Sequence, residues 1–314
     1  MDALLSSLPI HHAFADATVD APYSLAHALA VTKDTMFWCL VGMACLAIVD
    51  VVAARRWKAR YFFMHSIMNG VITLLVLPDS WRILSDPLGA LESRVCSSVP
   101  LGLVFAIHFY HMLGGMIGFR LYYVDWLHHI IMVVLGCPCI MFAAMGPTVN
   151  FNFLFVCGIP GGLDYLMLVL VKEGAMKALD EKRYNTLLNV WCRCPFLIST
   201  VCLTFVQLHM HKPPLHIVCI RIFCMAINWW NGLYFMERVV SNYYVTHHKL
   251  KQALKSNKRS ELEISKMADT RELKYTKTLV DAPEEHPLPS APGAPRSMKT
   301  KTAKSVWEFI RAGS

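Results

Sequence analysis

The chain has 314 residues, of which 55% are hydrophobic and only 17% are charged, and its mean hydropathy is +0.41. A soluble domain of this length normally has a lower hydropathy, so the composition argues against an ordinary water-soluble protein. A large soluble all-α protein is the alternative, but its helices would be amphipathic, whereas the segment 130–145 has no polar face. The formal net charge is +8, so the placement of the basic residues is informative about membrane orientation.

Seven apolar stretches are long enough to cross a bilayer. A helix needs about 20 mostly apolar residues to span ~30 Å of hydrocarbon. The stretches that meet this requirement are 34–53, 61–78, 100–119, 122–145, 150–171, 188–208 and 214–240. We therefore expect an all-α, multi-pass membrane protein with about seven transmembrane helices.

The segments outside the spans differ from them in composition. Residues 1–33 are expected to be extracytoplasmic and uncleaved, since they lack the basic start and the apolar core of a signal peptide. The tail 241–314 begins with a basic stretch and is Pro-rich over 281–297, which predicts a disordered cytoplasmic segment. Residues 304–312 form either a short amphipathic helix or a frayed terminus.

Polar side chains occur inside six of the predicted spans, where each costs several kcal/mol unless it faces the bundle interior. At ~1.5 Å per residue, they lie roughly 6–18 Å from the cytoplasmic ends of their spans. This shared depth predicts one polar chamber that opens toward the cytoplasm, although any single residue could instead form a helix-packing hydrogen bond. The residues are His65, Asn69, His111, His128, His129, Asp164, Arg193, Asn228 and Asn231.

The most concentrated chemistry lies in Asp125-Trp-Leu-His128-His129. On a helix, Asp125 is one turn from both histidines, so its carboxylate could accept an N–H from one imidazole and set its tautomer. The other ring nitrogen would then be available as a base or a nucleophile. Adjacent histidines project about 100° apart, so one can face a cavity while the other meets a neighbouring helix.

A metal site is a second interpretation of the same region. His108 and His111 lie three residues apart, and together with Asp125, His128 and His129 they resemble part of a membrane di-iron histidine cluster. The only later histidine pairs, His209/His211 and His247/His248, are predicted to lie on opposite sides of the membrane. We therefore expect no bound metal.

These motifs, taken in order, resemble those of the TLC-domain family, which includes the ceramide synthases. The resemblance covers roughly residues 58–240 and depends on order and spacing more than on any single motif. It is carried by Arg60-Tyr-Phe-Phe-Met-His65-Ser66 with Asn69 and Asp79, by Asp125 with His128-His129, by Gly162-Leu-Asp164-Tyr165, by Trp191-Cys-Arg193, and by Ile227-Asn228-Trp229-Trp230-Asn231 with Tyr234, Phe235 and Met236.

The resemblance implies a six-helix core over 58–240, preceded by a first helix and a basic loop over 34–57, and a cavity for a long acyl chain. In ceramide synthases a histidine pair lies at the catalytic centre of acyl transfer, and the matching residues here are His128 and His129. Together with the polar residues described above, the candidate catalytic set is His128, His129, Asp125 and Asp164, and the candidate lipid-binding set is His65, Asn69, His111, Arg193, Asn228 and Asn231.

Two departures make the chain a divergent member of this family. The enzymes have two acidic residues three apart in an HDxxD-like motif, whereas Pro160-Gly-Gly-Leu-Asp164 keeps only the second. The acidic residue before the histidine pair is also nearer than in those enzymes, at Asp125.

Two functions fit these expectations. The first is a protein of lipid or sphingolipid metabolism, or of membrane lipid homeostasis, that binds long-chain acyl lipids without necessarily catalysing a reaction. The alternative is a ceramide-synthase-like N-acyltransferase that uses His128 and His129, with acyl-CoA as co-substrate and no other cofactor. A metal-dependent membrane oxidase is a remote alternative, and a seven-helix receptor shares only the helix count.

The expected partners are membrane lipids and long-chain acyl species rather than nucleic acid, with a homo-oligomer left open. The endoplasmic reticulum or another endomembrane is the expected compartment.

Basic residues near the span ends predict the orientation, because translocation of Lys and Arg is disfavoured. One side of the membrane carries nine of them: Arg55, Arg56, Lys58, Arg60, Arg120, Lys172, Lys177, Lys182 and Arg183. The other side carries four: Lys33, Arg82, Arg94 and Lys212. The first side and the C-terminus are therefore predicted to be cytoplasmic.

A glycosylation acceptor site tests this orientation. An acceptor inserted near residue 90 should be modified in microsomes, because that loop is predicted to be lumenal, and one inserted after residue 260 should not. The modification is measured as a shift in gel mobility that an endoglycosidase removes. The opposite pattern would reverse the assignment of sides.

Overall fold

The computed structural model describes residues 23–117, 121 and 123–255, all within the unit Met1–Thr276. Most of the predicted N-terminal segment lies outside these residues. So do the Pro-rich stretch 281–297 and the segment 304–312 of the predicted tail.

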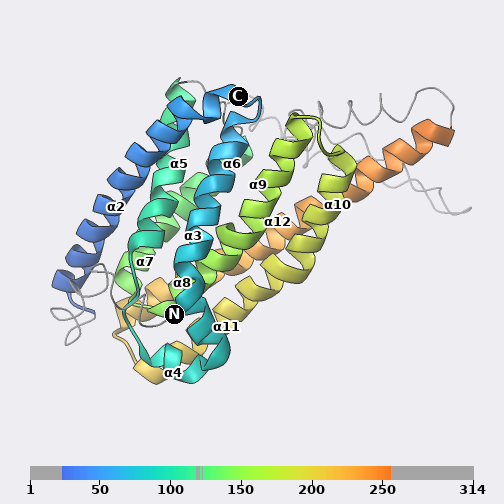
Figure 1. Ribbon diagram of the computed structural model, residues 1–314. Coiled ribbons are helices and arrows are strands. Elements are labelled where there is room, and N and C mark those ends of the chain that lie inside the picture. Colours follow the sequence, from blue (N-terminus) through green and yellow to red (C-terminus); the bar gives the residue numbers. More distant parts are fainter. Residues whose placement is uncertain (1–22, 118–120, 122, 256–314) are drawn as a thin grey trace, which may run out of the picture. The chain divides into compact units, whose positions relative to one another are not determined.

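Every regular element in the described residues is helical, as Figure 1 shows. A short 3₁₀ turn, Ala54–Arg56, joins the first two long helices. The α-helices are α2 (Leu25–Val52), α3 (Arg60–Ser85), α4 (Pro87–Glu92), α5 (Val99–Ile117), α6 (Tyr123–His128), α7 (Cys137–Ala143), α8 (Pro147–Phe153), α9 (Ile159–Lys172), α10 (Ala178–Leu188), α11 (Cys194–His211) and α12 (Leu215–Lys255).

Six continuous helical segments are long and apolar enough to cross a membrane. They are Leu25–Val52, Arg60–Ser85, Asp125–Ala143, Pro147–Lys172, Ala178–His211 and Leu215–Gln252. A shorter apolar helical stretch, Val99–Leu113, corresponds to the remaining predicted span, 100–119. The chain is therefore an all-α, multi-pass integral membrane protein, and the predicted fold class is confirmed.

The ends of two helices differ from the predicted span boundaries. α2 begins at Leu25, nine residues before the predicted span 34–53, and the Ser24 hydroxyl caps it by accepting a hydrogen bond from the His27 N–H at 3.1 Å. α12 continues past residue 240 to Lys255, so the first part of the predicted tail is helical. Hydropathy locates the hydrocarbon-spanning part of a helix and misses turns that extend beyond it.

Three spans contain a π-helical stretch, and each stretch ends two residues before a proline. The stretches are His129–Gly136, Leu154–Gly158 and Asn189–Arg193, and the prolines are Pro138, Pro160 and Pro195. Proline has no N–H to donate and its ring clashes with the carbonyl four residues earlier, which disfavours the regular α-helical pattern there. The wider π turn accommodates this conflict and changes the register of the side chains before it.

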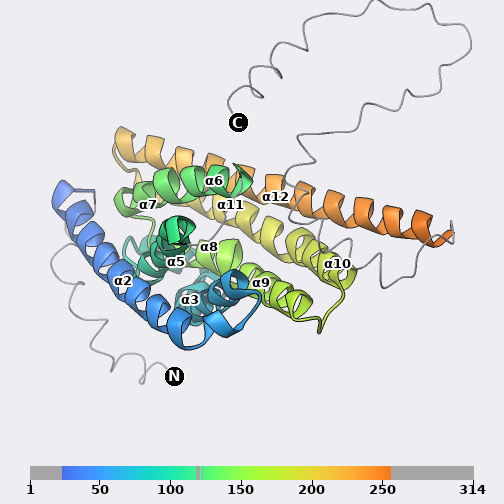
Figure 2. The ribbon, with the colours of Figure 1, turned by 90° about the horizontal axis from the view of Figure 1, so that it is seen from above.

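α2 lies at the edge of the bundle, packed mainly on α5, in both views (Figures 1 and 2). The backbones approach closely because each helix presents a glycine to the other. A Cβ at Gly102 of α5 would lie 2.6 Å from Trp38 Cβ, and one at Gly42 of α2 would lie 2.7 Å from Ala106 Cβ. The two helices are also joined by a polar contact, in which the Tyr110 hydroxyl donates to the Asp50 carboxylate at 2.8 Å.

A buried ion pair connects α2 to α3 near the same position. Asp50, which is 1% exposed, accepts a two-point contact from the Arg60 guanidinium at the start of α3. A carboxylate within an apolar helix costs free energy unless it is paired, and this arrangement places the pair between three helices. Asp50 therefore serves to fix the first span against α3 and α5.

Gly102→Ala should lower the melting temperature of the protein in detergent, because its Cβ would meet Trp38 Cβ at 2.6 Å and the Thr35 carbonyl oxygen at 2.8 Å. Overpacking of this kind typically costs ~1–3 kcal/mol of unfolding free energy. Gly70→Ala is the matched control, because no atom lies within 4 Å of a Cβ at that position. Equal melting temperatures for the two variants would contradict a tight α2–α5 contact.

Candidate functional site

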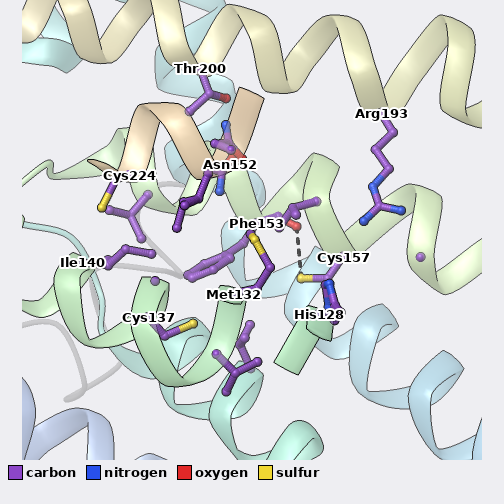
Figure 3. Close-up of a pocket in the computed structure, with 18 of the residues that line it drawn as sticks. His128, Met132, Cys137, Ile140, Asn152, Phe153, Cys157, Arg193, Thr200 and Cys224 are labelled. Atoms are coloured by element: carbon purple, nitrogen blue, oxygen red, sulfur yellow. Dashed lines mark hydrogen bonds between the residues drawn. The ribbon is translucent and has the colours of Figure 1, made fainter. Parts of the chain in front are cut away.

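An internal cavity of about 150 Å³ lies within the bundle (Figure 3). A water-sized group needs ~10–15 Å³ of this volume, so the cavity holds on the order of ten such groups. Its walls come from α3, α5 and every later span, whereas no residue of α2 lines it. The first span therefore lies outside the set of helices that line the cavity.

The ionisable side chains of the cavity are gathered in one part of it. Tyr165 stacks on the His65 ring with centroids 4.5 Å apart, and Asp164 precedes Tyr165 on α9. His128 and the Arg193 guanidinium contact the same Phe235 ring, at 5.4 and 5.3 Å from its centroid. In Figure 3, Arg193 extends from its helix toward the side of the cavity where His128 lies.

The rest of the cavity wall is uncharged. It is mostly aliphatic, with a few neutral polar groups such as Thr200, Thr204 and Asn152. The apolar lining residues are Val104, Met132, Val133, Ile140, Met145, Val149, Phe153, Val156, Val201, Met225 and Ile227. The site therefore combines an ionisable region with an apolar chamber.

The two adjacent histidines have different environments. His128 lines the cavity, and its buried Nδ1 has no hydrogen-bond partner. His129 is 2% exposed and does not line the cavity; its Nε2 meets His111 Nε2 and its Nδ1 meets the Asp125 main-chain carbonyl. One histidine thus faces the cavity and the other a neighbouring helix, as their angular offset predicted.

The contact between Asp125 and the histidine pair is different from the expected one. We expected the Asp125 carboxylate to accept the imidazole N–H, whereas the observed acceptor is the main-chain carbonyl of Asp125. The two residues are four apart, which places that carbonyl directly beneath the His129 ring on the helix.

Imidazoles from three spans form a connected chain that begins at the cavity wall with His65. His65 Nε2 lies 3.0 Å from His111 Nδ1, and His111 in turn contacts His129. His108 lies beside this chain, with its Nδ1 2.6 Å from the Val104 carbonyl oxygen. These contacts give three buried histidines polar partners from other helices, which stabilises the packing of α3 and α5 against the π-helical stretch that follows α6.

Within the described residues, no group of three or more His, Cys, Asp or Glu side chains could hold a metal ion. The geometry of the histidines explains this. The Nδ1 atoms of His108, His111 and His129 each face a main-chain carbonyl, and the Nε2 atoms of His111 and His129 face each other.

The cavity brings together part of the residue set predicted from the sequence. His65, Asn69, His128, Asp164, Arg193 and Asn228 line it, whereas Asp125, His111, His129 and Asn231 do not. Asn228 also donates to the Leu197 carbonyl at 3.1 Å, and Asn231 is fully buried elsewhere on α12.

Several lining residues were not predicted as site residues. His108 was noted only as a metal candidate, and its position one turn before His111 was the available signal. Tyr165, Asn152, Thr200 and Thr204 also line the cavity. Single polar groups of this kind in an apolar helix have the same sequence pattern as helix-packing residues, so periodicity alone does not separate the two.

No protein-family model, curated protein or solved structure matches the chain. The fold and the cavity therefore define its class: it is a multi-pass α-helical membrane protein that encloses a cavity with an ionisable region and an apolar chamber.

Proposed function

We propose that the protein binds a long-chain acyl lipid in this cavity and acts in lipid or sphingolipid metabolism or in membrane lipid homeostasis. The observation that carries the proposal is the combination of an apolar chamber with a cluster of ionisable groups, inside a membrane-embedded bundle. The polar end and the first part of the chain of such a lipid are complementary to these two parts, and the rest of a long acyl chain would extend beyond the 150 Å³ of the cavity. The resemblance to the TLC-domain family, in the residues given above, agrees with this ligand class.

The polar part of the cavity would decide which lipid binds. An acyl chain that leaves the bilayer for an apolar cavity gains little hydrophobic free energy, because lipid tails are equally apolar. Selectivity must therefore come from hydrogen bonds at the polar end. Arg193 is suited to this, because its Nε is buried without a hydrogen-bond partner and its guanidinium can donate to an ester, amide or carboxylate oxygen.

Acyl transfer is the second candidate, and the environment of His128 favours it. A buried imidazole nitrogen without a partner, on the cavity wall, is available to take a proton. In transfer from acyl-CoA to a long-chain amine, His128 would accept the proton of the amine as its nitrogen attacks the acyl carbonyl. The carbon–sulfur bond would break as the amide forms, and the coenzyme A thiolate would leave with the proton returned by His128.

Lipid binding is tested by purification in mild detergent followed by mass spectrometry of the bound lipids. The wild-type protein should retain an acyl lipid near one equivalent. Val201→Trp should reduce this amount several-fold, because Val201 lines the cavity and the indole would fill it. Cys202→Trp is the matched control, since the adjacent Cys202 is exposed on the outer surface of α11. Equal lipid content in the two variants, or none in the wild type, would refute the proposal.

His128→Gln tests the transferase candidate, because Gln retains hydrogen bonding but cannot take a proton. Transfer from a long-chain acyl-CoA to a long-chain amine should fall by ~10²–10⁴-fold at unchanged protein abundance. His209→Gln, at an exposed position of α11, should retain full transfer. Wild-type activity in His128→Gln would exclude His128 as the base, and absence of transfer in the wild type would leave lipid binding alone.

A further inference from the structure

A second polar cluster lies away from the cavity, at the end of the bundle where α4 lies. Gln207 of α11 organises it: this side chain is fully buried and donates to the carbonyl oxygens of Leu91 at 3.2 Å and Met145 at 3.1 Å. It thereby joins α11 to the end of α4 and to the turn between α7 and α8. We call this junction, with the side chains of Tyr23, Arg94, His211 and Arg221, the α4-end junction.

Arg221 is the largest fully buried side chain of the described residues, at 0% exposure. Its Nε donates to the Ala143 carbonyl at 2.9 Å and its Nη2 to the Ala144 carbonyl at 2.6 Å, so it caps the C-terminus of α7. The partial negative charge of a helix C-terminus offsets part of the guanidinium charge. The third nitrogen, Nη1, is buried and has no hydrogen-bond partner.

A second cation lies close to the first. The Arg94 guanidinium carbon is 5.4 Å from the centroid of the Tyr23 ring, and that of Arg221 is 5.9 Å from the same centroid. His211, at the end of α11, lies beside them and faces the backbone of Leu91 and Glu92. Two guanidinium groups therefore lie around one aromatic ring.

No described carboxylate forms an ion pair with Arg94 or Arg221. Of the acidic residues near this end of the bundle, Asp79 contacts Asn150 and Arg82, and Asp86 caps α4 through the Gly89 N–H, whereas the Glu92 side chain, at the end of α4, is exposed. A buried guanidinium without a counter-ion is costly, and a second cation beside it raises that cost. Water could satisfy the free Nη1 hydrogens, but it would not neutralise the charge.

We propose that the α4-end junction binds a phosphate group, supplied by a lipid headgroup or by free phosphate, between Arg94 and Arg221. The planar guanidinium fork matches the oxygens of a phosphate, and two such forks neutralise its charge. Arg221 lies six residues, ~9 Å along the helix, from the start of α12, so it is near one end of that span. Neither arginine lines the cavity, so this site is independent of the proposed acyl-lipid function.

The site is tested on the full-length protein by thermal unfolding. In detergent, inorganic phosphate is compared with chloride at equal ionic strength. In nanodiscs, phosphatidylcholine alone is compared with an equimolar mixture of phosphatidylcholine and phosphatidylglycerol. Phosphate, phosphatidylglycerol or both should raise the melting temperature by several degrees, since a ligand at 100 times its dissociation constant favours the folded state by about 100-fold.

Arg94→Gln should lose most of this stabilisation, because it removes one cation without touching the cap on α7. Arg82→Gln is the matched control, because Arg82 is a more exposed arginine near the same end of the bundle, paired with Asp79. It should respond to phosphate as the wild type does. A response of Arg94→Gln equal to that of the wild type, or no response of the wild type to either probe, would overturn the proposal.

The two probes identify the source of the phosphate. Stabilisation by phosphatidylglycerol alone assigns a lipid headgroup, whereas stabilisation by inorganic phosphate as well shows that the free anion reaches the site. An acid of the chain itself is the competing occupant, because Asp16 and Asp20 precede Tyr23 in the sequence. If phosphate stabilises only an Asp16→Asn/Asp20→Asn variant and not the wild type, a carboxylate of the chain fills the site and the proposal fails.

Discussion

A polar side chain on a helix in lipid costs free energy unless a neighbouring helix supplies its hydrogen-bond partner, because the hydrocarbon supplies none. The histidines that join α3, α5 and the stretch after α6 follow this constraint. His65, His111 and His129 are each 3% exposed or less, whereas Leu40, Leu74 and Trp191 on the outer faces are 67%, 69% and 76% exposed. The polar residues consequently determine which face of each helix turns inward, and the apolar residues cover the outside.

The cavity depends on a second feature, the prolines within the spans. Pro138, Pro160 and Pro195 each follow a π-helical stretch, and residues of all three stretches line the cavity. A π turn adds a residue and locally widens the helix, which changes the register of the side chains on either side. The prolines thus interrupt the regular α-helical pattern of three spans next to the cavity.

The two polar clusters of the bundle differ in how their charges are balanced. In the cavity, Arg193 and Asp164 both line the wall, so groups of either sign are available to a ligand. At the α4-end junction, Arg94 and Arg221 gather around Tyr23 without an acidic partner in the described residues. The first arrangement suits an amphiphile with both donors and acceptors at its head, and the second suits an anion.

The sequence alone determined the fold class and the approximate spans, because an apolar stretch of helical length is a local property of the chain. The stretch 150–171, for example, corresponds to the helical segment Pro147–Lys172. Hydropathy missed the start of α2 at Leu25 and the extension of α12 to Lys255, because turns outside the hydrocarbon carry no apolar signal. Four of the side chains grouped by their shared depth, His65, His128, Asp164 and Arg193, are charged or titratable groups that line the cavity.

Only the tertiary structure decided which of these polar residues face the cavity and which join helices. The angle between His128 and His129 implied that they face different ways, but not which of them faces inward. That outcome depends on the position of His111 on α5, which contacts His129 and leaves His128 on the cavity wall. The cationic pair of Arg94 and Arg221 likewise arises because a loop and a distant helix meet at one ring, a proximity that depends on helix packing rather than on any local pattern.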